Sequence, residues 1–213
     1  MARGKIVFTP CVSRAVILPG DAYLSLEDES FNAGTGDLHV DAVLKVEADT
    51  PHREVLVAGK GNPHQSGGVG WQVFVDRDLT ALGLRINDGQ ENPAVYLSDP
   101  DLFTLGEWFW ASWALDRDGD PQIRFNGGLC GDGYLGYGEA GYGDYGYGGS
   151  PPPADYGGSL DNSLPLVAGQ NAKISLAHLR VGLGQVWPDA WISREWCRLR
   201  YGLAPEVYDF LAL

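Results

Sequence analysis

The fold is decided by a stretch in the first quarter of the chain that reads Leu38-His39-Val40-Asp41-Ala42-Val43-Leu44-Lys45-Val46. Successive side chains of a β-strand point to opposite faces, and for part of its length this stretch alternates as a half-buried strand does. The residues predicted to share the buried face are Leu38, Val40, Ala42, Leu44 and Val46. The stretch therefore predicts a strand with one face in a hydrophobic core.

Short apolar or alternating runs of the same kind recur along the chain, separated by Gly, Asp, Asn and Pro. The nine further strands that they predict span 23–26, 55–59, 71–75, 82–86, 94–97, 108–115, 122–125, 164–168 and 174–181. Tight turns that need φ > 0 are predicted at Asn87-Asp88-Gly89, Asp118-Gly119 and Asn126-Gly127. So many strands favour an all-β sandwich of two sheets.

The end of the chain reads differently, and residues 193–213 predict a short helical tail. Ser193 can cap a helix over 194–201, Gly202 can end it, and Pro205 can open a second turn. The apolar residues of this region are Trp191, Trp196, Leu199, Leu203, Val207, Phe210 and Leu211. We expect them to dock on the sandwich, with docking on a partner as the alternative.

Length and charge exclude several classes of protein. The 213 residues, 44% of them apolar, suffice for one core, so we expect a single domain over 1–213. The formal net charge of −13 repels nucleic acid and anionic lipids, and no apolar run is long enough for a transmembrane helix. The three cysteines, Cys11, Cys130 and Cys197, are too few and too far apart for a disulfide framework or a paired zinc motif.

Export by a signal peptide is not supported by the first residues of the sequence. Charge and Pro10 interrupt any apolar run after Met1, and Ala15 to Leu18 is too short for the apolar region of such a peptide. The sequence therefore does not predict export through the secretory pathway.

Six motifs occur in an order that resembles the concanavalin A-like jelly roll of the laminin G-like type. They are Gly20 to Leu26, Phe31 with Gly36-Asp37-Leu38, Val57 to Gly61, Gly70 to Val75, Gly106 to Ala111, and the hairpin from Asp116-Arg117-Asp118-Gly119 to Phe125-Asn126-Gly127. The resemblance covers about residues 20–200 and implies an all-β, two-sheet antiparallel jelly-roll sandwich with a short C-terminal helical segment. Such domains are mostly ligand-binding or structural modules, some of which bind calcium or glycans, so the resemblance fixes no ligand.

The most unusual segment is residues 131–158, which hold six of the ten tyrosines and eleven of the thirty glycines. So much glycine predicts a loop without a strand or helix of its own, and Pro151-Pro152-Pro153 predicts an extended piece. The tyrosines expected to contact a ligand or partner are Tyr134, Tyr137, Tyr142, Tyr145, Tyr147 and Tyr156. The alternative is a loop that decorates a hairpin without binding anything.

No pattern in the sequence predicts an enzyme. The E-x-D-x-x-E strand of jelly-roll glucanases and the G-x-S-x-G nucleophile motif are both missing, and the four histidines lie in no recognisable motif. No cofactor is expected, although calcium is possible because Asp116, Asp118 and Asp120 are weak metal candidates. A plain hydrophilic hairpin turn is the alternative for these three residues.

Two hypotheses for function follow. The first is a non-catalytic virion surface or structural protein, on the capsid or tail of a phage, made in the host cytoplasm and located on the virion surface. Its partners would be other virion proteins or itself, through assembly or host-surface binding. The second is an extracellular or cell-surface lectin-like carbohydrate-binding module, which calcium could assist and whose partner would be a cell-surface glycan.

Overall fold

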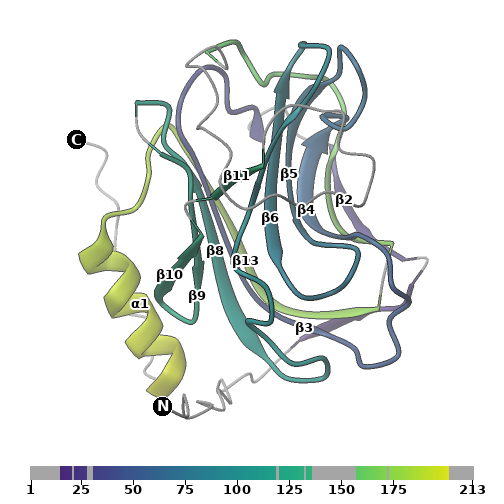
Figure 1. Ribbon diagram of the computed structural model, residues 1–213, viewed down its shortest axis with the longest axis vertical. Helices are drawn as coiled ribbons and strands as arrows, with labels where there is room; N and C mark the ends of the chain where they lie inside the picture. Colours follow the sequence, from purple (N-terminus) through teal and green to yellow (C-terminus); the bar gives the residue numbers. More distant parts are fainter. Residues whose placement is uncertain are drawn as a thin grey trace.

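The computed structural model describes residues 15–20, 22–27, 31–118, 120–131, 133–135, 157–171 and 173–201, which form two stacked antiparallel sheets and one helix (Figure 1). Sheet A contains, in spatial order, β1 (Val16–Leu18), β13 (Ile174–Leu183), β3 (Leu38–Val46), β8 (Phe109–Leu115), β9 (Gln122–Phe125) and β10 (Gly128–Gly131). Sheet B contains β11 (Gly133–Leu135), β7 (Ala94–Leu97), β6 (Leu82–Asp88), β5 (Val69–Val75), β4 (Val55–Gly61), β12 (Leu166–Gln170) and β2 (Leu24–Leu26). Helix α1 (Asp189–Tyr201) follows the last strand. The all-β sandwich with a C-terminal helix is confirmed.

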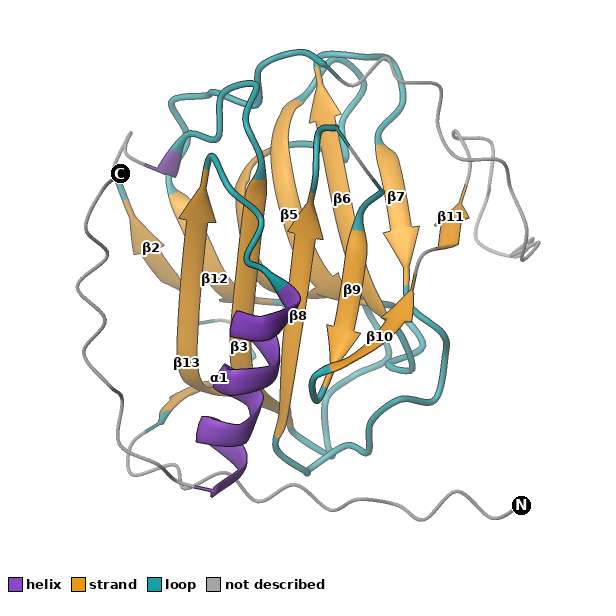
Figure 2. Ribbon diagram, turned by 90° about the vertical axis from the view of Figure 1, so that its left-hand side faces the viewer, coloured by secondary structure: helices purple, strands orange, loops and turns teal. Residues whose placement is uncertain are grey.

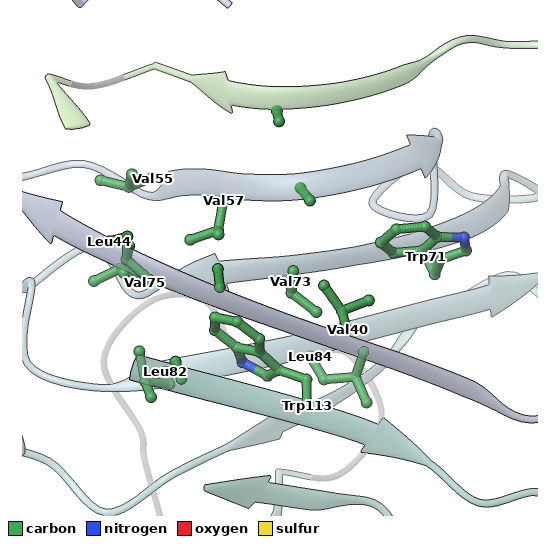
Figure 3. Packing of buried hydrophobic residues seen from close by; sticks show 14 of the residues in the cluster. Val40, Leu44, Val55, Val57, Trp71, Val73, Val75, Leu82, Leu84 and Trp113 are labelled. Carbon is green, nitrogen blue, oxygen red and sulfur yellow. The ribbon is translucent and has the colours of Figure 1, made fainter. Parts of the chain in front are cut away.

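The core lies between the two sheets, where the alternating face of β3 was predicted to point. Leu38, Val40, Ala42, Leu44 and Val46 are each at most 1% exposed. Figure 3 shows Val40 and Leu44 of β3 packed with Trp113 of β8 and with side chains of β4, β5 and β6 from the other sheet. Because successive residues of a strand alternate, the remaining residues of β3, among them His39 and Asp41, point out of the core.

Two of the predicted turns have the expected backbone conformation. Asn126 and Gly127 have φ values of 48° and 82°, and they connect the paired residues Phe125 and Gly128 of β9 and β10. Positive φ at both positions is the geometry of a two-residue hairpin turn, which explains the Asn-Gly sequence. Gly89 also has a positive φ, of 99°. Gly119 of the third predicted turn lies outside the described residues.

Three strands were not predicted, namely β1, β10 and β11. The prediction that the segment 131–158 forms no strand is wrong for Gly133–Leu135, which pairs with β7 as strand β11, and for Gly131, which ends β10. Main-chain hydrogen bonds to an edge strand do not depend on side chains, so the glycine content of this piece does not prevent the pairing. Residues 132 and 136–156 lie outside the described residues.

Helix α1 begins at Asp189 instead of Arg194, because its first turn uses Pro188 in place of Ser193. The backbone N–H groups of Trp191 and Ile192 donate to the Pro188 carbonyl oxygen at 2.9 and 3.0 Å, and the Asp189 carboxylate lies in the first turn, where the helix dipole favours negative charge. Residues 202–213, which include Gly202, Pro205, Leu203, Val207, Phe210 and Leu211, lie outside the described residues. In the described part of the chain, no helix is long and apolar enough to cross a membrane.

Candidate functional site

The outer face of sheet A is covered by α1, which lies in front of the strands of this sheet in Figure 2. Ile192 of the helix is 1% exposed and packs in one cluster with Val43 of β3 and Trp110 of β8. The rings of Trp110 and Trp196 stack with their centroids 6.0 Å apart. The predicted docking of the C-terminal region on the sandwich is therefore confirmed for Trp191, Trp196 and Leu199, which pack against this cluster.

A buried ionic network joins the helix to sheet A. Arg180 of β13 donates from Nε to Asp41 Oδ1 at 3.0 Å, and its Nη2 lies 3.0 Å from Glu195 Oε1 of α1. Arg198 donates from Nε to Glu195 Oε2 at 2.8 Å. Burial raises the pKa of Asp41, but the neighbouring His178 and Arg180 hold it below its ordinary value. Each carboxylate of this network is paired within the chain, which gives the network a structural role.

His39, Ser112 and Asp41 lie together on this covered face, yet they cannot act as a nucleophilic triad. The backbone N–H of Trp187 donates to His39 Nδ1 at 3.2 Å, so the proton of the neutral ring lies on Nε2 and is donated to Ser112 Oγ at 2.8 Å. A base would have to accept the serine proton at that nitrogen. Burial also lowers the pKa of His39 to about 4, and both residues are 1% exposed.

The outer face of sheet B, which faces away from α1, contains a groove of about 450 Å³ (β4 and β5 in Figure 1). This volume lies within the range of about 300 to 1,000 Å³ that is usual for small-molecule sites. Its apolar lining residues are Leu56, Leu164, Pro165 and Val167. Its polar lining residues are Asn62, His64, Gln72, Gln170 and Asn171. None of these lining residues is an Asp, Glu, Lys or Arg.

The register of three strands builds the floor of this groove. Gly59 of β4 pairs with Val167 of β12 on one side and with Gln72 of β5 on the other, so these three residues form one row across the sheet. A Cβ at Gly59 would lie 2.7 Å from Gln72 Cγ and 2.9 Å from the Trp71 carbonyl oxygen. Only glycine fits here, and its missing side chain keeps the floor low between Val167 and Gln72.

Gln72 is held in place by the next residue of the row, Arg85 of β6. Arg85 Nη1 donates to Gln72 Oε1 at 3.0 Å. The same guanidinium donates to Glu54 Oε1 at 2.8 Å and to Glu54 Oε2 at 2.6 Å, and it lies 4.5 Å above the centre of the Phe74 ring. A bidentate pair stacked on an aromatic ring fixes both the position and the charge of Arg85.

Hydrogen bonds to Leu164 hold the wall of the groove that Leu164 and Pro165 form. Lys60, which is 2% exposed, donates from Nζ to the Leu164 carbonyl oxygen at 2.6 Å. The Leu164 N–H donates to Asn162 Oδ1 at 3.0 Å. The loop that precedes β12 is thus tied to β4, and the groove is part of the folded structure.

The residues predicted as site residues are not among the described residues that line this groove. Tyr134 is in β11, where its backbone pairs with Tyr96, whereas Tyr137, Tyr142, Tyr145, Tyr147 and Tyr156 lie outside the described residues. The Asp118 N–H donates to Asp116 Oδ1 at 3.0 Å, as in a hydrophilic turn, and Asp120 is exposed. Within the described ranges, no group of three His, Cys, Asp or Glu residues could hold a metal ion. The tyrosine contacts and the calcium site both stay predictions.

The groove residues were not singled out from the sequence, although a signal for them exists. Gln72 is a polar residue between the apolar Trp71 and Val73, so alternation places it on the outer face. Gly59 lies inside a strand, where glycine marks a close approach or an irregularity. Neither signal shows that β12 brings Gln170 to the same place, because that depends on the register of distant strands.

Among solved structures, the chain is similar to binding domains of toxins. The chain is similar to the binding domain of Paraclostridial Mosquitocidal Protein 1, with a TM-score of 0.60 and 11% identity over 90% of this chain and 46% of that chain. It is similar to the binding domain of Botulinum Neurotoxin DC in complex with SialylT (TM-score 0.61, 12% identity, 93% of this chain and 45% of that chain). It is also similar to the Botulinum neurotoxin serotype D ligand binding domain in complex with N-acetylneuraminic acid (TM-score 0.57, 12% identity, 90% of this chain and 43% of that chain).

These similarities show the fold. The chain spans less than half the length of the solved chains named above. No protein-family model and no curated protein matches the chain. The two antiparallel sheets fit a jelly roll, but the finer assignment to the laminin G-like type rests on the sequence motifs alone.

Proposed function

We propose that this chain is a non-catalytic carbohydrate-binding module, of the laminin G-like type, whose ligand lies in the groove on the outer face of sheet B. The observation that carries the proposal is the composition of that groove. Four amide side chains and a histidine surround a floor kept low by Gly59, beside apolar side chains on the wall. Sugars offer hydroxyl groups and C–H faces together, and amides with aliphatic side chains match both.

Two further observations support a binding role without catalysis. Among the described residues that line the groove there is no carboxylate, so they do not supply the pair of acids that most glycoside hydrolases use. The similar structures named above are binding domains, and two of them were determined in complex with SialylT or with N-acetylneuraminic acid. The virion hypothesis stays a prediction from the sequence, as do the virion location and the role of the tyrosine-rich segment.

The test is a glycan array screened with the whole chain and with a variant whose groove is blocked. Val167→Arg adds a long side chain over the floor of the groove, and we expect it to abolish the binding seen for the unchanged chain. Leu97→Arg is the matched control, because Leu97 lies on strand β7 of the same sheet but does not line the groove. Absence of binding to every glycan would contradict the proposed function, and equal binding by both variants would contradict its location.

A further inference from the structure

The amide of Gln72 has a defined orientation. A guanidinium has hydrogen-bond donors only, so the Gln72 atom that faces Arg85 Nη1 at 3.0 Å must be the carbonyl oxygen. The two N–H groups of Gln72 therefore face away from Arg85, and they have no hydrogen-bond partner among the described residues. Gln72 is 8% exposed and lines the groove. Among the described residues, the Gln72 amide nitrogen is not one of the buried polar atoms that lack a partner, so water can reach it in the groove and a ligand acceptor would replace that water.

The cations near the groove are already engaged. Both carboxylate oxygens of Glu54 accept hydrogen bonds from Arg85, which neutralises its charge. Lys60 donates to the Leu164 carbonyl oxygen and is 2% exposed. The carboxylate of an acidic sugar would lose part of its hydration in the groove, and neither Arg85 nor Lys60 would be available to pair with it. The formal net charge of −13 of the chain would add to this cost.

We infer that the groove selects an uncharged saccharide and that Arg85, held by Glu54, is the positioning residue that presents the Gln72 amide to an acceptor oxygen of that saccharide. This inference rests on the proposed function. The aliphatic side chains of Leu56, Leu164 and Val167 would contact the C–H face of the sugar ring. Gln170 and Asn171, both exposed at the rim, supply donors and acceptors for further hydroxyl groups.

The first experiment compares neutral oligosaccharides with the same oligosaccharides carrying a terminal N-acetylneuraminic acid. The whole chain is screened on an array of both sets, and the tightest ligand is titrated by calorimetry. We expect the neutral set to bind and the terminal acid to weaken binding at least about tenfold, because its carboxylate would lie unpaired among amides. Preference for the acidic set would overturn the inference while the proposed function stands, and absence of binding to both sets would overturn both.

The second experiment changes Gln72 itself. Gln72→Glu keeps an oxygen facing Arg85 but replaces the N–H donors by a second acceptor, so the affinity for the neutral ligand should fall at least about tenfold. Gln90→Glu adds the same charge at an exposed position that does not line the groove and should leave the affinity unchanged. Unchanged affinity in Gln72→Glu, with an unchanged thermal midpoint, would overturn the role of Gln72 while the proposed function stands.

The positioning role of Arg85 is tested by a double-mutant cycle. Arg85→Met frees the Gln72 amide to rotate and should weaken the neutral ligand several-fold. Once Gln72 is replaced in Gln72→Leu, the added Arg85→Met change should have no further effect on affinity, because Arg85 acts through Gln72. A merely structural role would give independent losses that add, and additive losses would overturn this part of the inference.

Discussion

Both outer faces of the sandwich carry polar side chains that point out of the core, but the partners of these side chains differ between the two faces. Asp41 on sheet A points out of the core and is covered by α1, where Arg180 pairs with it. Gln72 on sheet B also points out of the core, and one side of its amide faces an open groove. A polar group that is paired within the chain stabilises the fold, whereas one that lacks a partner is available to a ligand.

The comparison separates stability from recognition. The network under α1 consists of charges that are costly to bury unless every one is paired, so substitutions in it should lower the free energy of unfolding. The amides of the groove are neutral and lie near solvent, so substitutions of them should lower the affinity for the ligand and leave the free energy of unfolding almost unchanged. Four predictions test this division, in order of decreasing effect on the free energy of unfolding.

Asp41→Ala should cause the largest loss. The substitution removes a carboxylate that is fully buried and leaves Arg180 without its partner on β3, which costs about 3 to 5 kcal/mol in buried pairs of this kind. Glu54→Ala is the matched change on the sheet B face and should cost about 1 kcal/mol, because the Glu54 side chain is 29% exposed. Urea unfolding of both variants measures the difference, and equal losses would contradict the division.

Ile192→Ala should destabilise the protein by about 2 to 4 kcal/mol. Ile192 is 1% exposed between the helix and sheet A, so its truncation leaves a cavity in the cluster with Trp110. Leu164→Ala, in the wall of the groove, should cost less than about 1 kcal/mol because Leu164 is 41% exposed. The midpoints of chemical unfolding give both values. A larger loss for Leu164→Ala would place part of the core at the groove.

The stability of the protein should fall by about 2 kcal/mol between pH 7 and pH 5 because of His39. The pKa of His39 is lowered by burial to about 4, whereas the unfolded chain takes up the proton near 6.5. The nearby Asp41 raises this pKa, and Arg180 and Arg124 lower it. The contribution is complete above pH 6.5 and is lost as the pH falls toward 4.

Urea unfolding at several pH values measures this effect. His39→Gln should flatten the dependence between pH 7 and pH 5, whatever the stability of the variant. The same slope in the variant and the unchanged chain would show that another group takes up the proton.

Gln170→Ala should have the smallest effect on stability, within about 0.5 kcal/mol, since Gln170 is exposed and the truncation leaves no cavity. Its effect should be seen in the affinity for a neutral saccharide, which should fall about two- to tenfold with the loss of one hydrogen bond. Gln90→Ala should leave both quantities unchanged. Thermal unfolding and calorimetric titration of the two variants test this, and a loss of stability without a loss of affinity would exclude Gln170 from the site.

Alternation in the sequence predicted the strands and the core well. The predicted bounds of Leu38–Val46, Ala94–Leu97 and Gln122–Phe125 are those of the structure. The strands β1, β10 and β11 were missed because Val16-Ile17-Leu18 does not alternate, as Leu24-Ser25-Leu26 of β2 does, and because β10 and β11 lie in or beside the glycine-rich segment. Helix α1 was predicted to begin too late because Ser193, a common capping residue, lies inside the helix and Pro188 accepts the first hydrogen bonds.

The candidate site could not be predicted in the same way. Alternation places Asp41 and Gln72 outside the core, but it does not tell whether a helix covers that side of the sheet. The groove also needs Gln72 of β5 to pair with Gly59 and Gln170 of β12 to pair with Leu56, and this depends on the register between strands far apart in the chain. The tyrosine-rich segment gave the stronger local signal, and most of it lies outside the described residues.

The pairing of β3 with β13 has a consequence for how the chain is made. These strands are central neighbours in sheet A, yet the hydrogen-bonded residues Asp41 and Arg180 are 139 positions apart. During synthesis from the N-terminus, the edge of β3 that pairs with β13 stays unpaired until all strands of sheet B have been made. Contacts at such separation form slowly, so the waiting strand is the place where a newly made chain would be most exposed to aggregation.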